Sequence, residues 1–203
     1  MKFILLACFT ALAFAQGTEP KPKASQYEVS GKSGNVELGA EYMVHSFSGD
    51  GQMFINENAL VVEVAMYPPK GETLNVQSGA FSLRINGKKP ALAAMTTDAF
   101  IASLKRKSRF PGMLSLPGLG GMGGPSQGPG LGGPFPTPTS VPPGGPKRGN
   151  VGATAEDVAA SSALPEGPTE QPVAGFIYFP FSGKMSSVKS VELVYDREVL
   201  TLK

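Results

Sequence analysis

The sequence is poor in the residues on which most enzymes and metal sites rely. Its 203 residues include one cysteine, one histidine and no tryptophan. One cysteine cannot form an internal disulfide, and one histidine cannot build a multi-histidine metal site. A formal net charge of +2 gives no chain-wide reason to bind nucleic acid or an anionic membrane. Phosphate-loop, dinucleotide-binding and zinc-cysteine motifs are also missing, so no cofactor is expected.

The first fifteen residues predict a signal peptide. A positive Met1-Lys2 precedes an apolar run over 3–12, and Ala13-Phe14-Ala15 offers the small residues that direct cleavage between Ala15 and Gln16. The run is too short for a transmembrane helix. A lipid anchor at Cys8 is the alternative, but it leaves only seven residues before the cysteine. We therefore expect a secreted or periplasmic protein whose mature chain carries no transmembrane anchor.

Charge disappears from the middle of the chain. No charged residue occurs over 110–146, and the 39 residues of 111–149 include 13 glycines and 10 prolines. This composition cannot bury enough apolar surface to offset its conformational entropy, so we expect a disordered insert over 111–170. Within it, Thr154 and Asp157 have capping-box spacing and predict a short helix over 155–163. Residues 16–25, polar and proline-containing, are predicted to be a linker.

The rest of the chain alternates between apolar and polar residues, as strands do. Such patterns occur at 36–47, 60–67 and 81–85, and Asn86-Gly87 predicts a hairpin turn. Residues 97–107 fit a helix and a strand equally well. The C-terminal piece, 171–203, is too small to form its own core. We therefore expect it to complete one antiparallel β-sandwich begun by residues 26–110, an all-β fold of the immunoglobulin type.

Four aromatic residues of one C-terminal strand are the candidate protein contact. The run over 173–181 is apolar on both faces, which indicates either burial on both sides or one exposed contact face. Core packing is the favoured interpretation, and contact with a partner or strand addition is the alternative. Pro180 restricts that end of the strand to a sheet edge or strand end. The candidate contact residues are Phe176, Tyr178, Phe179 and Phe181.

Other chemistries have weaker sequence support. Met43, His45 and Met53 could serve a copper-handling module, although neighbours two apart on a strand cannot easily chelate one ion. Ser48 and Asp50 lie near His45, but Ser48-Gly49-Asp50-Gly51 is more simply a turn than part of a catalytic triad. The glutamates at 37, 41 and 63 allow a carboxylate-based hydrolase, and are better explained as a solvated strand face. Lys105-Arg106-Lys107 is either a solvated boundary, a protease site or a contact with an anionic surface; it lacks the nearby aromatic residues that nucleic-acid binding uses.

The predicted signal peptide occurs together with the strand over 60–67, the Phe-Ser-Leu-Arg-Ile-Asn-Gly-Lys run at 81–88, and Gly-Phe-Ile-Tyr-Phe-Pro at 175–180 before Val-Glu-Leu-Val-Tyr at 191–195. This combination resembles uncharacterised secreted bacterial proteins with an immunoglobulin-like sandwich. The resemblance implies a fold and an extracytoplasmic location, and it transfers no catalytic residue. Our hypothesis is an exported, non-enzymatic binding or structural module that contacts a protein or envelope component.

Overall fold

The computed structural model describes residues 17–108 and 152–203. Its regular elements are strands, three single-turn 3-10 helices and two α-helices. The α-helices are α1 Thr97–Ser108 and α2 Ala155–Ser161, and the 3-10 turns are η1 Ala24–Gln26, η2 Ser78–Ala80 and η3 Met185–Ser187. The strands are β1 Val29–Ser33, β2 Val36–Val44, β3 Ser46–Gly49, β4 Gln52–Ile55, β5 Ala59–Tyr67, β6 Leu74–Val76, β7 Phe81–Ile85, β8 Leu92–Ala93, β9 Gly167–Thr169, β10 Val173–Pro180, β11 Val191–Tyr195 and β12 Glu198–Thr201.

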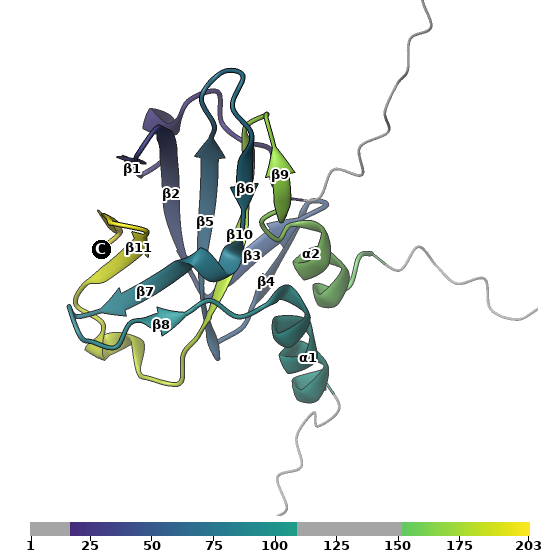
Figure 1. The fold of residues 1–203 in the computed structure, drawn as a ribbon. Coiled ribbons are helices and arrows are strands. Elements are labelled where there is room, and N and C mark those ends of the chain that lie inside the picture. Colours follow the sequence, from purple (N-terminus) through teal and green to yellow (C-terminus); the bar gives the residue numbers. More distant parts are fainter. Residues whose placement is uncertain (1–16, 109–151) are drawn as a thin grey trace, which may run out of the picture.

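Two four-stranded antiparallel sheets face each other and enclose the main core (Figure 1). The first has the order β1-β2-β5-β10 and the second β12-β11-β7-β8, while β3-β4 and β6-β9 form two small sheets. Strands from before 109 and after 151 therefore share both large sheets. This arrangement confirms the predicted all-β class; the immunoglobulin type stays a prediction. The fully buried residues of the main core include Leu38, Ala40, Leu60, Val62, Val64, Met66, Leu83, Phe179, Val191 and Leu193.

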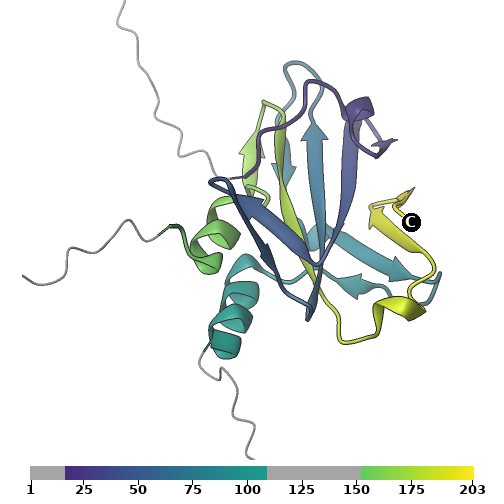
Figure 2. The ribbon, with the colours of Figure 1, turned by 180° about the vertical axis from the view of Figure 1, so that it is seen from behind.

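A second core lies on the outer face of the first sheet, where β5 and β10 are buried again. Helices α1 and α2 and the β3-β4 hairpin cover this face at one end (Figure 2). This double burial explains why β5 and β10 are apolar on both sides. The second core consists of Phe47, Ala59, Val61, Phe100, Val158, Ala159, Ala163, Phe176 and Tyr178.

The N-terminal segment covers the other end of the same face. Tyr27 packs against Ala65 and Ala174 in a small third cluster. Thr18 donates a 2.6 Å hydrogen bond from Oγ1 to Glu63 Oε1, and its backbone N–H donates to Ala174 at 2.9 Å. The predicted linker over 16–25 is therefore wrong for the described residues 17–25. Their polar groups find partners on the sheet, which composition alone did not reveal.

The insert boundary at 170 is also wrong. Residues 152–170 include α2 and β9, and β9 pairs with β6. The capping box at Thr154 and Asp157 is present, and α2 starts where it predicts. The ambiguous segment 97–107 is helical. Phe100 and Leu104 are one turn apart, so a helix places both on the face that packs against the second core. The expectations for 1–16 and 109–151, including the signal cleavage at Ala15 and Gln16 and the anchor at Cys8, lie outside the described residues.

The long strand predicted over 36–47 is interrupted. A β-bulge separates Tyr42 from Val44, and Val44 has a positive φ of 61°. The chain turns at His45 and starts the separate β3-β4 hairpin. No helix among residues 17–108 and 152–203 has the length and apolarity needed to cross a membrane.

Candidate binding edge

The four predicted contact residues do not form a contact face. Phe176, Tyr178 and Phe179 are at most 3% exposed, and only Phe181 is half-buried. The predicted contact is wrong for the three buried residues, and the favoured interpretation of core packing is confirmed for them. Their burial follows from β10, whose two faces point into two different cores.

Tyr178 shows how completely β10 is enclosed. Its ring stacks on Phe100 of α1, with ring centroids 3.8 Å apart, and meets Phe47 edge-to-face at 6.0 Å. Its hydroxyl donates to the carbonyl oxygen of Ala159 in α2 at 3.2 Å. Burial raises the pKa of the Tyr178 phenol well above its usual range. The side chain therefore fastens both helices to the sheet.

The free edge of β10 is closed by three other segments. The Thr18 N–H donates to Ala174, and the Met95 N–H donates to the Tyr178 carbonyl at 2.8 Å. Between them, the Phe176 N–H donates to the Ser162 carbonyl at 2.9 Å, and the Leu164 N–H donates back to Phe176 at 3.0 Å. Pro180, which has no N–H, ends the strand as the sequence predicted. These contacts rule out strand addition over Ala174–Tyr178 in the folded state.

The β3-β4 hairpin provides a different edge. Its two-residue turn, Asp50-Gly51, has positive φ at both positions (51° and 73°), the conformation that two-residue hairpin loops favour. Phe47 and Phe54 lie opposite each other and stack toward the second core, with centroids 5.7 Å apart. Their paired burial fixes which face of the hairpin points inward.

The same register exposes Met53 and Ile55. Their side chains lie on the opposite face from Phe54 and are 68% and 69% exposed. They are the most exposed of the large hydrophobic residues among those described. Exposed apolar residues that are adjacent on one strand face mark an interaction surface more often than scattered ones do.

The backbone of β4 is also unpaired at these two residues. In an antiparallel hairpin, hydrogen-bonded pairs alternate with non-bonded pairs, and the pair beside a two-residue turn is bonded. Gly49–Gln52 and Phe47–Phe54 are therefore bonded pairs, in agreement with the Asn56 N–H donating to the His45 carbonyl at 2.9 Å. The N–H and C=O groups of Met53 and Ile55 point away from β3. Neither residue has a backbone hydrogen bond on that side within the described ranges.

Acidic residues flank this edge. Asp50 in the turn and Glu57 after the strand are both exposed, and neither takes part in a salt bridge among the described residues. The edge thus combines four backbone groups that no described residue pairs with, two apolar side chains and a negative charge at each end.

The copper and triad hypotheses gain no support from the geometry. His45 Nδ1 lies 2.6 Å from the carbonyl oxygen of Ala59, and its ring packs against Phe181 at 6.2 Å. Met43 packs against the second core, whereas Met53 points to solvent. No hydrogen bond joins His45 to Ser48 or Asp50 in the described part of the chain. No group of three or more His, Cys, Asp or Glu side chains suited to a metal ion occurs there either.

The predicted carboxylate face is divided among structural contacts. Glu41 pairs with Lys21, and Glu63 accepts the hydrogen bond from Thr18. Lys21 also lies over the ring of Tyr27, 4.5 Å from its centroid, so the pair helps to hold the N-terminal segment. Glu37 is exposed on β2. These glutamates do not converge on a pocket that could serve acid–base catalysis.

Comparison with known proteins found no matching family model, no matching curated protein and no matching solved structure. The sequence contained one usable signal for the β4 edge. Residues 52–55 follow a turn sequence, and Phe54 stands between two apolar residues, Met53 and Ile55, that a strand would place on the opposite face. Four residues are too short a pattern to assign a strand, and from sequence Met53 is a candidate only as a copper ligand.

Proposed function

We propose that this chain is an exported, non-enzymatic binding module that captures an extended segment of a partner protein at β4 by strand addition. The observation that carries the proposal is the coincidence of unpaired backbone groups and exposed side chains at Met53 and Ile55. Main-chain hydrogen bonds supply affinity in this mode, and alternating side chains supply specificity. Export rests on the signal sequence predicted at residues 1–15.

The charges favour a partner other than a second copy. If β4 paired with itself in antiparallel fashion, Met53 opposite Ile55, then Gly51 would lie opposite Glu57 and bring Asp50 beside the partner's Glu57. Like charges this close repel each other and would weaken such a strand pair. A partner segment with lysine or arginine near both ends would instead complement the two carboxylates. An exposed apolar edge strand also promotes aggregation. Its presence here therefore favours a binding role for this edge.

A photo-crosslinker at position 53 tests the proposal on the mature protein mixed with an envelope fraction of the source cell. We expect one saturable crosslinked product that unlabelled wild-type protein competes away. The matched control carries the crosslinker at Val199, which is 41% exposed on edge strand β12. Crosslinking at 53 no greater than at 199 would contradict the proposal.

Two competitor variants separate backbone pairing from side-chain contact. Met53→Pro removes an N–H that has no partner among residues 17–108 and 152–203, so the β3-β4 ladder stays intact. Met53→Ala removes the side chain and keeps the N–H. We expect the proline variant to lose competition and the alanine variant to retain part of it. A proline variant that competes as well as wild type, with an unchanged thermal midpoint, would exclude strand addition.

A further inference from the structure

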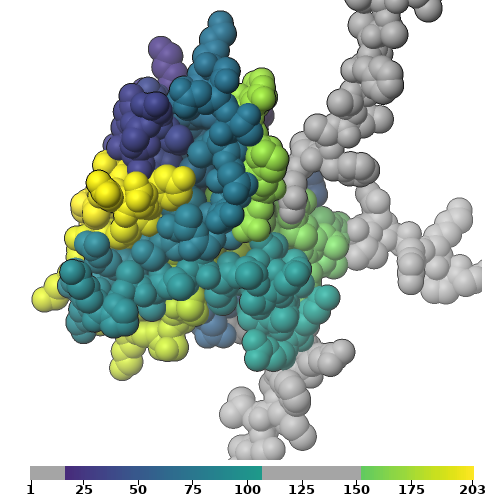
Figure 3. Space-filling view, in the orientation of Figure 1, coloured from purple at the N-terminus to yellow at the C-terminus, as the bar shows by residue number. Residues whose placement is uncertain are grey.

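A second candidate site lies at one end of the sandwich, away from β4. The β7-β8 hairpin and the segment that follows β10 enclose an open cavity of about 380 Å³ there. In Figure 3 these two segments meet at the lower left of the surface, the hairpin in teal and the later segment in yellow-green. Such a volume falls at the small end of the range typical of ligand sites.

The floor of this cavity is apolar. Leu83, Ile85, Leu92 and Phe181 line it. Leu83 belongs to the main core, and the other three pack against that core. The floor is therefore backed by the main core, whose close packing keeps it from collapsing when a ligand leaves.

Asn86 holds the two walls together. Its Nδ2 donates to the Ser187 carbonyl at 2.8 Å, and its Oδ1 accepts from the N–H groups of Lys189 and Ser190 at 2.7 and 3.1 Å. Its own N–H donates to the Ser190 carbonyl at 2.9 Å. These four bonds fasten the hairpin turn to residues 187–190. The cavity is thus preformed, which lowers the entropic cost of binding.

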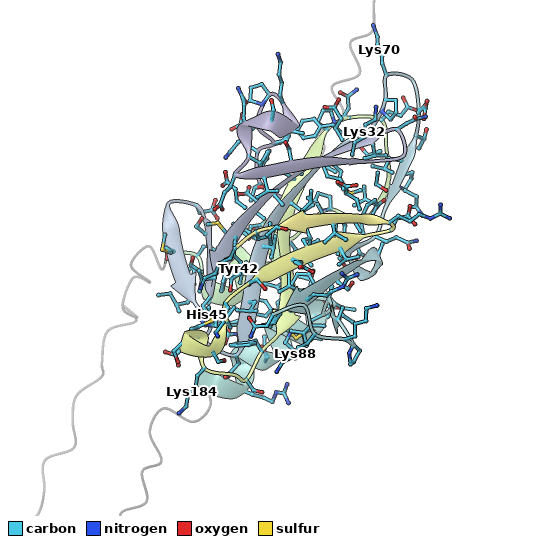
Figure 4. The ribbon with its side chains drawn as sticks, turned by 90° about the vertical axis from the view of Figure 1, so that its left-hand side faces the viewer. Lys32, Tyr42, His45, Lys70, Lys88 and Lys184 are labelled. Atoms are coloured by element: carbon cyan, nitrogen blue, oxygen red, sulfur yellow. The ribbon has the colours of Figure 1, made fainter. Side chains whose placement is uncertain are left out.

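The mouth of the cavity is positively charged. Lys88 and Lys89 line it, and the lining contains no carboxylate. Both lysines are exposed, and neither makes a salt bridge to any described residue. Lys184 adds a cation at the same end of the molecule, whereas Lys70 lies at the opposite end (Figure 4).

We infer that this cavity binds an anionic amphiphile, with a short apolar chain against Leu83, Leu92 and Phe181 and a carboxylate or phosphate beside Lys88 and Lys89. The apolar floor selects for a chain, and the unpaired lysines select for negative charge. A simple inorganic anion would leave the floor empty, and a cationic or neutral amphiphile would leave the lysines without a counter-charge. The site is distinct from β4 and does not depend on the function proposed there.

Calorimetric titration with decyl phosphate and decanoate, below their micellar concentrations, tests this inference on the mature protein. We expect saturable binding of one molecule per chain, weakened by added salt as exposed charge pairs are. The preferred head group shows whether a phosphate or a carboxylate ligand is the better fit. Inorganic phosphate and decyltrimethylammonium are expected to show no saturable binding.

The charge-reversed variant Lys88→Glu/Lys89→Glu should bind the anionic probes at least about tenfold more weakly, a change of about 1.4 kcal/mol. Lys70→Glu is the matched control, because it reverses an exposed lysine remote from the cavity, and it should bind like wild type. Both variants should keep the wild-type thermal midpoint. Equal binding of decyl phosphate and decyltrimethylammonium, unchanged binding in the double variant, or no saturable binding would each overturn the inference.

Discussion

The edge of β10 is covered by other segments of the chain, whereas the edge of β4 is exposed. The edge of β10 carries the most aromatic stretch of the chain, and Thr18, Met95 and Ser162–Leu164 cover it with hydrogen bonds. The edge of β4 carries two exposed apolar side chains, and the part of the chain that the structure describes supplies no backbone partner along Met53 and Ile55. Hydrophobicity alone therefore does not identify a binding strand. What matters is whether the rest of the chain supplies partners for its edge.

The closed edge depends on distant parts of the sequence. The segments that cover β10 come from the N-terminus, from the residues before α1 and from the residues after α2. The N-terminal segment is held by the third cluster around Tyr27, and the other two segments are held by the second core. The open edge belongs to a hairpin whose inward face, Phe47 and Phe54, also packs on the second core. Weakening the second core should therefore expose the edge of β10, whereas substitutions at Met53 and Ile55 should leave the fold intact.

Phe100→Ala should give the largest effect. Phe100 is fully buried and stacks on Tyr178, so its loss leaves a cavity between α1 and β10. We expect the free energy of unfolding to fall by about 3–5 kcal/mol. Urea denaturation measures this free energy. The control is Arg106→Ala, because Arg106 is exposed on the same helix, and it should change the free energy of unfolding by less than about 0.5 kcal/mol. Equal effects of the two variants would show that the second core contributes little.

Gly175→Ala tests the closure of β10 directly. A Cβ at this position would collide with the backbone of Leu164, which cannot move without breaking its bond to Phe176. Overpacking of this kind costs about 1–3 kcal/mol. Gly79→Ala is the control, because a Cβ there meets nothing within 4 Å. Thermal unfolding of the two variants should differ accordingly, and matched midpoints would argue against close packing at this edge.

Thr154→Ala should cost about 1 kcal/mol, because it removes the cap of the helix that leads into Ser162. Thr154→Ser keeps the capping hydroxyl and should retain most of the wild-type stability.

Hydrogen bonds from the Thr154 side chain and backbone lower the pKa of Asp157. The stability contributed by Asp157 is thus fully present above its unfolded pKa and is lost as the pH falls through the folded value. Asp157→Asn should reduce this acid dependence in denaturation curves recorded between pH 2 and 6; an unchanged dependence would contradict the assignment.

Two tyrosines should differ in the stability they lose when their hydroxyls are removed. Tyr178→Phe loses the bond to Ala159 and should be destabilised by about 1 kcal/mol. The Tyr42 hydroxyl is buried without a partner among the described residues, so Tyr42→Phe should be neutral or slightly stabilising. Equilibrium denaturation at pH 7 compares them, and a loss in Tyr42→Phe as large as in Tyr178→Phe would be inconsistent with this structure.

The same Tyr42 variant has a signature at alkaline pH. Burial raises the pKa of Tyr42 to about 12. Because a raised pKa means that the folded state resists ionisation, the stability is present below the unfolded value of about 10 and is lost as the pH rises toward 12. Tyr42→Phe should remove part of this alkaline loss. An identical alkaline slope in wild type and variant would contradict the assigned burial.

The strand pattern and the cap were predictable because both are local. Alternation identified the buried face of β7 and only one of the two buried faces of β5, and the spacing of Thr154 and Asp157 identified the start of α2. Residues 17–25 and 152–170 could not be assigned from composition, since their order comes from bonds to β10 and β6 that are remote in sequence. The β4 edge was missed for a related reason. An open edge is defined by what the rest of the fold leaves uncovered.

Amide hydrogen exchange, resolved residue by residue in the isolated mature protein, tests the central contrast most directly. We predict that the amides of Met53 and Ile55 exchange close to the rate of an unstructured peptide, while those of Phe54 and Asn56 are protected by β3. The amides of Phe176 and Met95 should be protected as well, because they form the closure of β10. Protection of Met53 and Ile55 equal to that of Phe54, or free exchange at Phe176, would contradict the account.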